Sequence, residues 1–307
     1  YIKSTAISGC EKLESVEFEK ESKLVSIDEG AFSHSSFSEI KLPSSLNEIK
    51  KNAFARCENL QKVVFENNTK LRFIGKHAFS FTSIESFVFP ENVEIFEKEW
   101  CFYLSHLINI YLGPKNVHLS YFDSKVVIGK SNQNDDKYDT IIIARRNIDQ
   151  IKIPSFIKYI KSCAFFDCRY LEKVEFAEDS ELISIESYAF SGSSIKEITI
   201  PKHVKVIKKS AFDRCENLKE IKFQDDSELR EIGSFALNSI DLESFFIPKN
   251  VEIIKKGFNP YCRALTNIDV SPENKNFQLY NNKMIICKSN SKIDLCDSLL
   301  FINGIHD

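Results

Sequence analysis

The residues best suited to chemistry are the nine cysteines, because thiolates act as nucleophiles and metal ligands and thiols form disulfides. Five share one position, four residues after the first residue of a recurring pair of the Ala-Phe type: Cys10, Cys57, Cys168, Cys215 and Cys262. Zinc sites instead cluster their ligands in Cys-x-x-Cys-like spacing. The residue at the matching position of another copy is Leu104. We therefore interpret these cysteines as small buried apolar side chains.

The remaining candidates for chemistry are scattered. Cys163 and Cys168 are the closest cysteine pair, and we expect no functional role for them, whereas Cys287 and Cys296 are expected to be exposed. No histidine lies in a nucleophile or metal motif, and none recurs in the duplication described below: His34, His77, His106, His118, His203 and His306. None of the nine glycines forms a phosphate-binding loop. The sequence predicts no catalytic residue, cofactor or metal site, and hence no enzyme.

Composition narrows the partners. A net charge of −3 and an isoelectric point near 6.2 argue against nucleic acid, which basic surfaces bind. No apolar run approaches the roughly 18 residues of a membrane span. Phenylalanine is unusually abundant, with 26 copies against one Met and one Trp. A few core positions are therefore filled by Phe again and again.

The Ala-Phe pair marks an internal repeat. Clear copies begin at Ala31, Ala53, Ala78, Ala164, Ala189 and Ala211, and looser copies at Ala6, Trp100, Ala236 and Phe258. Successive copies lie alternately 25 and 22 residues apart within each half, so the period is about 23 residues. Each copy leads into an alternating apolar segment, for example Leu60-x-x-Val63-x-Phe65, which is typical of a strand with one buried face.

A unit of this length cannot bury its own apolar face, but stacking on identical neighbours buries it. The sequence therefore predicts a mainly β repeat solenoid: a right-handed coil of the leucine-rich repeat kind, with a parallel sheet and irregular or 3₁₀ return segments. Units of 22 to 25 residues are too short for two helices per turn.

A larger duplication lies above this period. Shifting the chain by 158 residues aligns 1–149 with 159–307 without a gap, and about 60 of the 149 positions are identical. We predict one repeat array of about five coils at 1–112 and a second array at 151–270. Between them, 113–150 is a spacer with strands at 125–128 and 140–144 and a polar loop at 131–138, and 271–307 begins a second spacer.

The solenoid also bears on disulfides. Cysteines that recur every 47 residues are two coils apart, or about 10 Å at the spacing of stacked strands. A disulfide needs Cα atoms within about 7 Å. The recurring cysteines are therefore not expected to pair.

The repeat resembles a known family. The run Ile207-x-x-x-Ala211-Phe212-x-x-Cys215-x-x-Leu218-x-x-Ile221 is similar to the BspA-type leucine-rich repeat, and modules with spacers resemble the BspA-like proteins of parasitic protists. The resemblance implies a cell-surface or secreted protein that adheres to host matrix or cell-surface proteins, with no catalytic residues to transfer.

Partner binding is expected on the outward face of the strands, where most side chains are polar. Val64, Val88 and Tyr111 are three consecutive apolar exceptions, and Phe246 is another in the second array. An exposed apolar patch on a polar sheet suggests a contact site, so these four are the candidate partner-binding residues. In the alternative interpretation, the spacer 113–150 folds over them and they are core.

Two functions remain open. The first is an adhesin-like surface or secreted protein that binds a protein ligand, and the second is an intracellular, cytoplasmic scaffold that uses the same sheet. Many free cysteines favour a reducing compartment, whereas the family resemblance favours export. The motif Asn67-Asn68-Thr69 is a glycosylation sequon that matters only for an exported chain.

Overall fold

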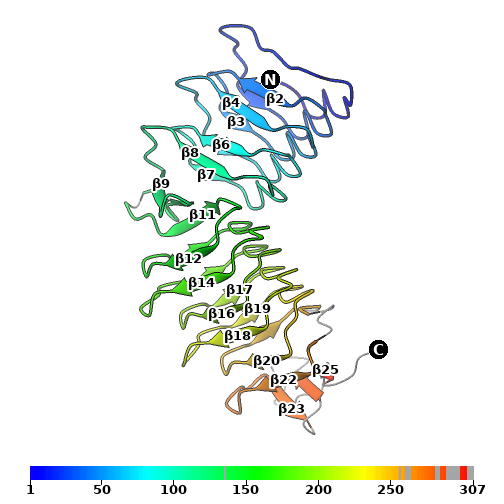
Figure 1. The fold of residues 1–307 in the computed structure, drawn as a ribbon, viewed down its shortest axis with the longest axis vertical. Helices are drawn as coiled ribbons and strands as arrows, with labels where there is room; N and C mark the ends of the chain where they lie inside the picture. The colour runs from blue at the N-terminus through cyan, green and yellow to red at the C-terminus, as the bar shows by residue number, and fades with distance from the viewer. Residues whose placement is uncertain (135, 256, 260–263, 281–283, 288–297, 303–307) are drawn as a thin grey trace. The chain divides into compact units, whose positions relative to one another are not determined.

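The computed structural model describes residues 1–134, 136–255, 257–259, 264–280, 284–287 and 298–302. Two compact units emerge from the internal contacts. The first contains Tyr1–Ile148 and Lys161–Cys168, and the second contains Asp149–Ile160 and the chain from Arg169 onward. The described residues contain strands and turns but no helix, so each unit is a stack of β coils (Figure 1).

The coils of the first unit that follow the first one each contribute one long and one short strand. The long strands form a parallel sheet in the order β2 (Glu39–Leu42), β4 (Lys62–Phe65), β6 (Ser86–Phe89) and β8 (Asn109–Leu112). The short strands form a second parallel sheet in the order β1 (Ser26–Ile27), β3 (Glu48–Ile49), β5 (Phe73–Ile74) and β7 (Ile95–Phe96). The solenoid prediction is confirmed, but the return side forms a sheet of its own.

The second unit repeats this plan. Its long strands are β12 (Gln150–Ile153), β14 (Lys173–Phe176), β16 (Glu197–Ile200) and β18 (Glu220–Phe223), followed by the pair β20 (Ser244–Ile247) and β22 (Asn267–Val270). Its short strands are β13 (Tyr159–Ile160), β15 (Ser184–Ile185), β17 (Val206–Ile207), β19 (Glu231–Ile232) and β21 (Ile253–Ile254). Paired short strands are parallel, as stacking of equivalent segments requires.

Antiparallel strands follow each array. The first set is β9 (Leu119–Phe122), β10 (Val126–Gly129) and β11 (Thr140–Ala144), and the second is β23 (Phe277–Tyr280), β24 (Met284–Cys287) and β25 (Ser298–Ile302). The strands expected at 125–128 and 140–144 are present, and β9 is an addition. Strand β10 pairs with β9 and β11 in antiparallel register.

The Ala-Phe pair builds the core. The rings of Phe32, Phe54 and Phe79 stack on one another with centroids 5.3 Å apart and planes within 4°. Phe190 and Phe212 stack in the same way at 5.5 Å in the second unit. All five rings are fully buried, which explains the abundance of Phe.

Residues flanking each pair adopt a left-handed backbone conformation. Around Ala53-Phe54 the φ angles of Asn52 and Arg56 are 57° and 58°, and the same two positions are left-handed in other coils, such as Ser210 and Arg214. The backbone thereby turns so that Phe54 donates its N–H to the carbonyl of Ala78 in the next coil at 2.8 Å. The sequence does not reveal these left-handed positions, because most of them are not occupied by glycine, the residue that usually adopts this conformation.

The first coil departs from the prediction. The segment from Leu13 to Phe18, expected to be a strand like its equivalents, has no strand, and Leu13, Val16 and Phe18 are only half-buried. In the described structure nothing stacks on its outer side, so its apolar residues lack one of the two neighbours that bury equivalent residues elsewhere.

Candidate functional site

The sheet of long strands in the first unit carries an apolar row on its outer face. Val64, Val88 and Tyr111 occupy the same outward position on β4, β6 and β8, and Val88 is directly paired with Tyr111. Val88 is 43% exposed and Tyr111 49% exposed, while Val64 is half-buried. Val88 and Tyr111 are therefore open to solvent and Val64 is partly open, which contradicts the alternative in which the spacer buries the row.

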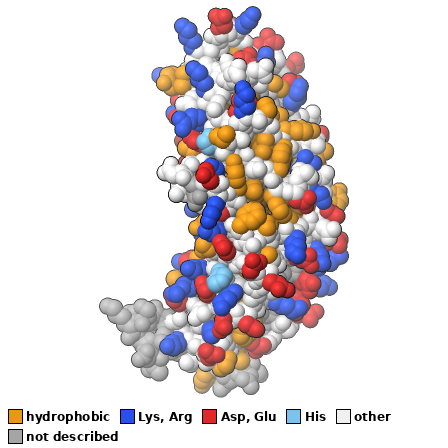
Figure 2. All heavy atoms as spheres, turned by 90° about the vertical axis from the view of Figure 1, so that its left-hand side faces the viewer, with side chains coloured by type: hydrophobic (Ala, Val, Ile, Leu, Met, Phe, Trp, Pro, Cys, Tyr) orange, Lys and Arg blue, Asp and Glu red, His pale blue; other side chains and the backbone are white. Residues whose placement is uncertain are grey.

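The row lines a hollow of about 450 Å³. Its rim is polar and includes Lys62, Glu66 and Glu91, and Asn67 of the glycosylation sequon lies on it. Pro90 and Pro114 add apolar surface at the ends of β6 and β8. We call this feature the apolar hollow. Figure 2 shows hydrophobic side chains gathered in a patch on one face of the molecule, among charged side chains.

One further aromatic residue contacts β8 from the spacer. Tyr121 lies on β9 and donates its hydroxyl to the carbonyl of Ile110 on β8 at 2.9 Å, and its side chain is partly exposed. Sequence reasoning missed it because no strand was expected at 119–122. The alternation of Leu119, Tyr121 and their neighbours could have signalled that strand.

The second unit has a hollow of about 500 Å³ at the equivalent position, and it includes the fourth candidate residue. Phe246, 44% exposed, stands there in place of Val88. Lys222 replaces Val64. Asp225 and Asp226 replace Asn67 and Asn68, which both line the apolar hollow. Val64, Val88 and Tyr111 thus share one hollow, whereas Phe246 lies in a charged one.

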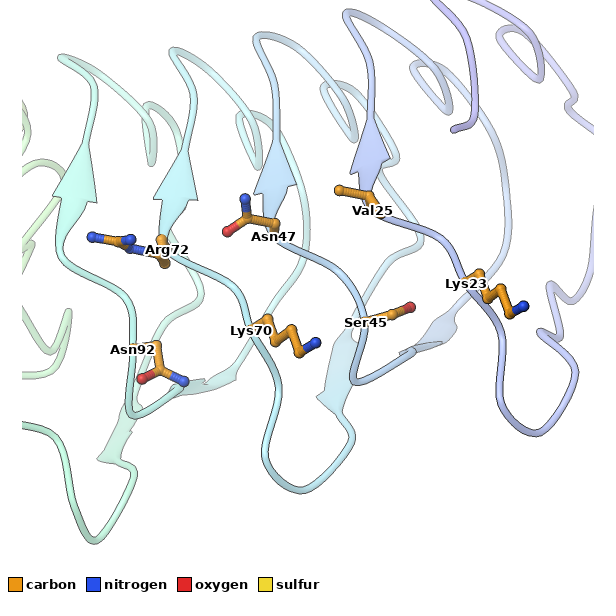
Figure 3. A pocket seen from close by; sticks show the side chains of 7 residues that line it. All are labelled: Lys23, Val25, Ser45, Asn47, Lys70, Arg72 and Asn92. Atoms are coloured by element: carbon orange, nitrogen blue, oxygen red, sulfur yellow. The ribbon is translucent and has the colours of Figure 1, made fainter.

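A third hollow, of about 600 Å³, lies beside the short strands of the first unit (Figure 3). Its lining comes from four successive coils: Lys23, Val25, Ser45, Asn47, Lys70, Arg72 and Asn92. Figure 3 shows Val25, Asn47 and Arg72 at the entries to their strands and Lys23, Ser45 and Lys70 on the loops that precede them. We call this feature the cationic hollow. Sequence reasoning missed it, although the recurrence of Lys23 and Lys70 at 47 residues was visible.

The repeat can now be compared with known proteins. Residues 1–117 and 143–266 match the family described as the BspA type leucine rich repeat region, in six copies. The chain belongs to this family. A search of curated protein sequences finds no match to this chain.

Solved structures of other proteins share the fold of this chain. The pneumococcal vaccine antigen PcpA is 26% identical with a TM-score of 0.76, and the match covers 88% of this chain and 66% of that one. This chain therefore spans just under two thirds of that antigen. A leucine rich cell surface protein from Faecalibacterium prausnitzii A2-165 is 19% identical with a TM-score of 0.57, covering 88% and 76% of the two chains. A leucine-rich repeat protein from Eubacterium ventriosum is 16% identical, with a TM-score of 0.55 and coverages of 81% and 77%. The last two likenesses show the fold.

The cysteines of the BspA-type coils are mostly core residues. Cys57 and Cys215 are buried and donate their thiols to the carbonyls of Phe32 and Phe190 at 3.0 and 3.1 Å. Burial raises the pKa of Cys57 to about 11 and that of Cys215 to about 12, so both stay protonated.

The outer cysteines differ from these. Cys10 is exposed, contrary to prediction, because it belongs to the first coil, whose outer side has no neighbour in the described structure. Cys287 is half-buried rather than exposed. Cys262 and Cys296 lie outside the described residues.

The first unit contains a buried arginine. Arg146 is 3% exposed and donates to the carbonyls of Leu104, Ala164 and Cys163 at 3.1, 3.0 and 3.3 Å. Its guanidinium also lies 3.8 Å from the sulfur of Cys168, which is buried as expected. The thiols of Cys101 and Cys163 interact beside it, and burial together with that interaction raises the pKa of Cys163. No acidic side chain pairs with Arg146 among the described residues.

The described residues contain no cluster of three or more His, Cys, Asp or Glu side chains arranged to hold a metal ion. Within the same part of the chain, no helix has the length and apolar character needed to cross a bilayer.

Proposed function

We propose that this chain is a non-catalytic binding region of a surface-exposed or secreted, adhesin-like protein, and that its apolar hollow contacts a host protein. One observation carries the proposal: Val64, Val88 and Tyr111 are consecutive apolar residues in a hollow on an otherwise polar sheet. Soluble proteins rarely expose such patches unless they form an interaction site.

The chemistry of the hollow suits a protein ligand. Aromatic residues dominate binding energy at interfaces, and Tyr111 offers both a ring and a hydroxyl. The charged rim of Lys62, Glu66 and Glu91 would surround an apolar contact as it does in protein interfaces. The partner we propose is a matrix or cell-surface protein that inserts an apolar side chain between Val88 and Tyr111.

The proposed location draws on the structural neighbours. One is described as a vaccine antigen and another as a cell surface protein. Both are bacterial, and the protist subgroup suggested by the spacers stays a prediction.

The second candidate is an intracellular scaffold that binds a protein through the same hollow. The observation that favours it is the set of six free cysteines at Cys10, Cys57, Cys101, Cys163, Cys168 and Cys215 in the described residues, since thiols persist in reducing compartments. Burial of five of them weakens this argument, because buried thiols are protected in either compartment.

Location is tested by labelling intact cells that express the full-length protein with a membrane-impermeant biotin reagent. Labelling without permeabilisation supports export. Labelling only after permeabilisation overturns the adhesin-like proposal and leaves the scaffold.

Binding is tested by solid-phase assays of the purified chain on immobilised matrix proteins and on intact host cells. Saturable binding that drops at least tenfold in Val88→Glu supports the proposal. The matched control is Thr199→Glu, which places the same charge at an outward position of β16 in the second unit. An equal loss in both variants would contradict a role for the apolar hollow.

A further inference from the structure

The cationic hollow contains positive charge that is only partly neutralised by its surroundings. Lys23, Lys70 and Arg72 line it, and its described lining contains no acidic residue. Arg72 is held from the side by Glu94, with its Nε 2.8 Å from the carboxylate. Lys23 and Lys70 form no ion pair with any described residue and are exposed. Two cations thus remain available to a ligand.

The equivalent surface of the second unit is different. Glu181 and Glu228 stand where the first unit has Lys23 and Lys70. Glu181 lies 3.7 Å from Lys158, and Glu228 lies 2.9 Å from His203. Both glutamates of the second unit therefore lie beside a basic side chain, whereas Lys23 and Lys70 have no acidic partner among the described residues.

We propose that the cationic hollow binds an acidic, extended peptide segment of a protein partner. Lys23 and Lys70 are two coils apart, or about 10 Å at the strand spacing of a sheet. About three residues of extended chain cover that distance, so the carboxylates of one short Asp- or Glu-rich segment reach both lysines. Asn47, on the coil between them, offers an amide for the peptide backbone, and Val25, on the coil of Lys23, offers an apolar contact.

The hollow is braced before a ligand arrives. Asn92 donates its amide to the carbonyl of Thr69 at 2.8 Å, and Ser45 donates its hydroxyl to the carbonyls of Ser22 and Leu24 at 2.7 and 2.8 Å. These bonds tie each loop to the coil before it. Binding therefore requires ordering of the lysine side chains but little rearrangement of the loops.

The same loops border the apolar hollow. Thr69 lines the apolar hollow, and the next residue, Lys70, lines the cationic hollow. Likewise, Glu91 lines the apolar hollow and Asn92 lines the cationic hollow. One partner can therefore place an apolar side chain in the first hollow and a neighbouring acidic segment in the second. This inference rests on the proposed function for the nature of the partner, but the preference of the cationic hollow for carboxylates is tested separately.

The test uses fluorescein-labelled hexaglutamate as the probe and hexaglutamine as the neutral reference, with fluorescence anisotropy of the purified chain at low and physiological salt. We expect hexaglutamate alone to bind, and more weakly as salt rises. The variant Lys23→Glu/Lys70→Glu carries the residues of the second unit and should weaken binding at least tenfold. The control Lys3→Glu/Lys12→Glu changes net charge equally outside the hollow and should retain most of the binding.

Three outcomes would overturn the inference. They are no binding of hexaglutamate, an equal loss in both double variants, and binding of inorganic tripolyphosphate or sulfated dextran in place of the peptide. The Val88→Glu variant separates the two proposals, because it should abolish binding to a host protein and leave hexaglutamate binding unchanged. Loss of hexaglutamate binding alone, with Val88-dependent binding intact, would refute only this inference.

Discussion

The outer faces of the two units differ at positions that the 158-residue duplication makes equivalent. Val64 corresponds to Lys222 and Tyr111 to Asp269, so the apolar row of the first unit becomes a row in which charged residues flank Phe246. The stacked core is retained, since Phe32 and Phe54 correspond to Phe190 and Phe212. A solenoid separates these roles: inward positions are fixed by stacking, and outward ones are free to change.

The largest expected effect on stability comes from a residue of the first unit that is not repeated at the equivalent position of the second. Arg146 corresponds to Gly304, so only the first unit has this buried guanidinium. Replacing it in Arg146→Met leaves the carbonyl of Leu104 without its donor, and we expect a loss of about 2–4 kcal/mol in unfolding free energy. Urea denaturation measures it, with Arg145→Met as the neighbouring control. Equal effects of the two variants would show that the buried hydrogen bonds are not decisive.

The next prediction exchanges the outward residues. Val64→Lys/Tyr111→Asp gives the first unit the residues of the second and should weaken binding to a host protein about 30-fold, or about 2 kcal/mol. The reciprocal change Lys222→Val/Asp269→Tyr should leave that binding intact. Surface plasmon resonance with the partner protein immobilised measures the affinity of both variants. If the reciprocal variant alone lost binding, the second unit would be the binding unit.

A smaller effect should be common to the two units. A Cβ atom on Gly75 would lie 2.6 Å from the backbone nitrogen of Lys51, and one on Gly233 would lie 2.5 Å from that of Lys209. Because backbone cannot move aside cheaply, we expect Gly75→Ala and Gly233→Ala each to cost about 1–2 kcal/mol. Thermal denaturation of the two variants checks this. A large effect at only one site would show that the coils are not equivalent in packing.

The smallest expected effect is a difference between the two units in how acidic pH changes stability. Hydrogen bonds from His77 and then Lys76, which lie 3.3 and 3.1 Å from Glu99, lower the pKa of this carboxyl from 4.5 to about 2. In the second unit, Phe235 and Gly257 replace His77 and Glu99. A depressed pKa adds stability above pH 4.5, and that stability is lost as the pH falls towards 2.

We expect Glu99 to contribute about 1 kcal/mol, since solvent screens a partly exposed pair. Urea denaturation of the wild type and Glu99→Gln at pH 7 and pH 3 measures it. The difference between the two proteins should shrink at the lower pH. A constant difference would mean that Glu99 acts through packing rather than charge.

Much of the fold was predictable from the chain alone. The spacing of the Ala-Phe pairs predicts the coil, because only stacked neighbours can bury a 23-residue unit. The alternation of Leu60, Val63 and Phe65 predicts β4, and the same pattern predicts its equivalents. The short-strand sheet was less visible, since two residues such as Phe73–Ile74 carry no periodicity of their own.

The candidate site was only partly predictable. Outward direction follows from alternation, so Val64, Val88 and Tyr111 could be placed on one face. Their exposure could not, because a sequence does not say whether the spacer covers them. The cationic hollow also escaped notice, because its residues come from loops of four coils whose conformation the repeat does not specify.

The sequence by itself determined the repeat, the Phe core and the correspondence between residues of the two halves. Each of these follows from the spacing of apolar residues along the chain and from their need for burial. The tertiary structure alone decided which outward residues stay open, how Arg146 is satisfied by carbonyls from two coils, and where unpaired lysines gather. These features depend on contacts between segments 17 to 47 residues apart, whose geometry is set by left-handed turns and loop packing rather than by any local pattern.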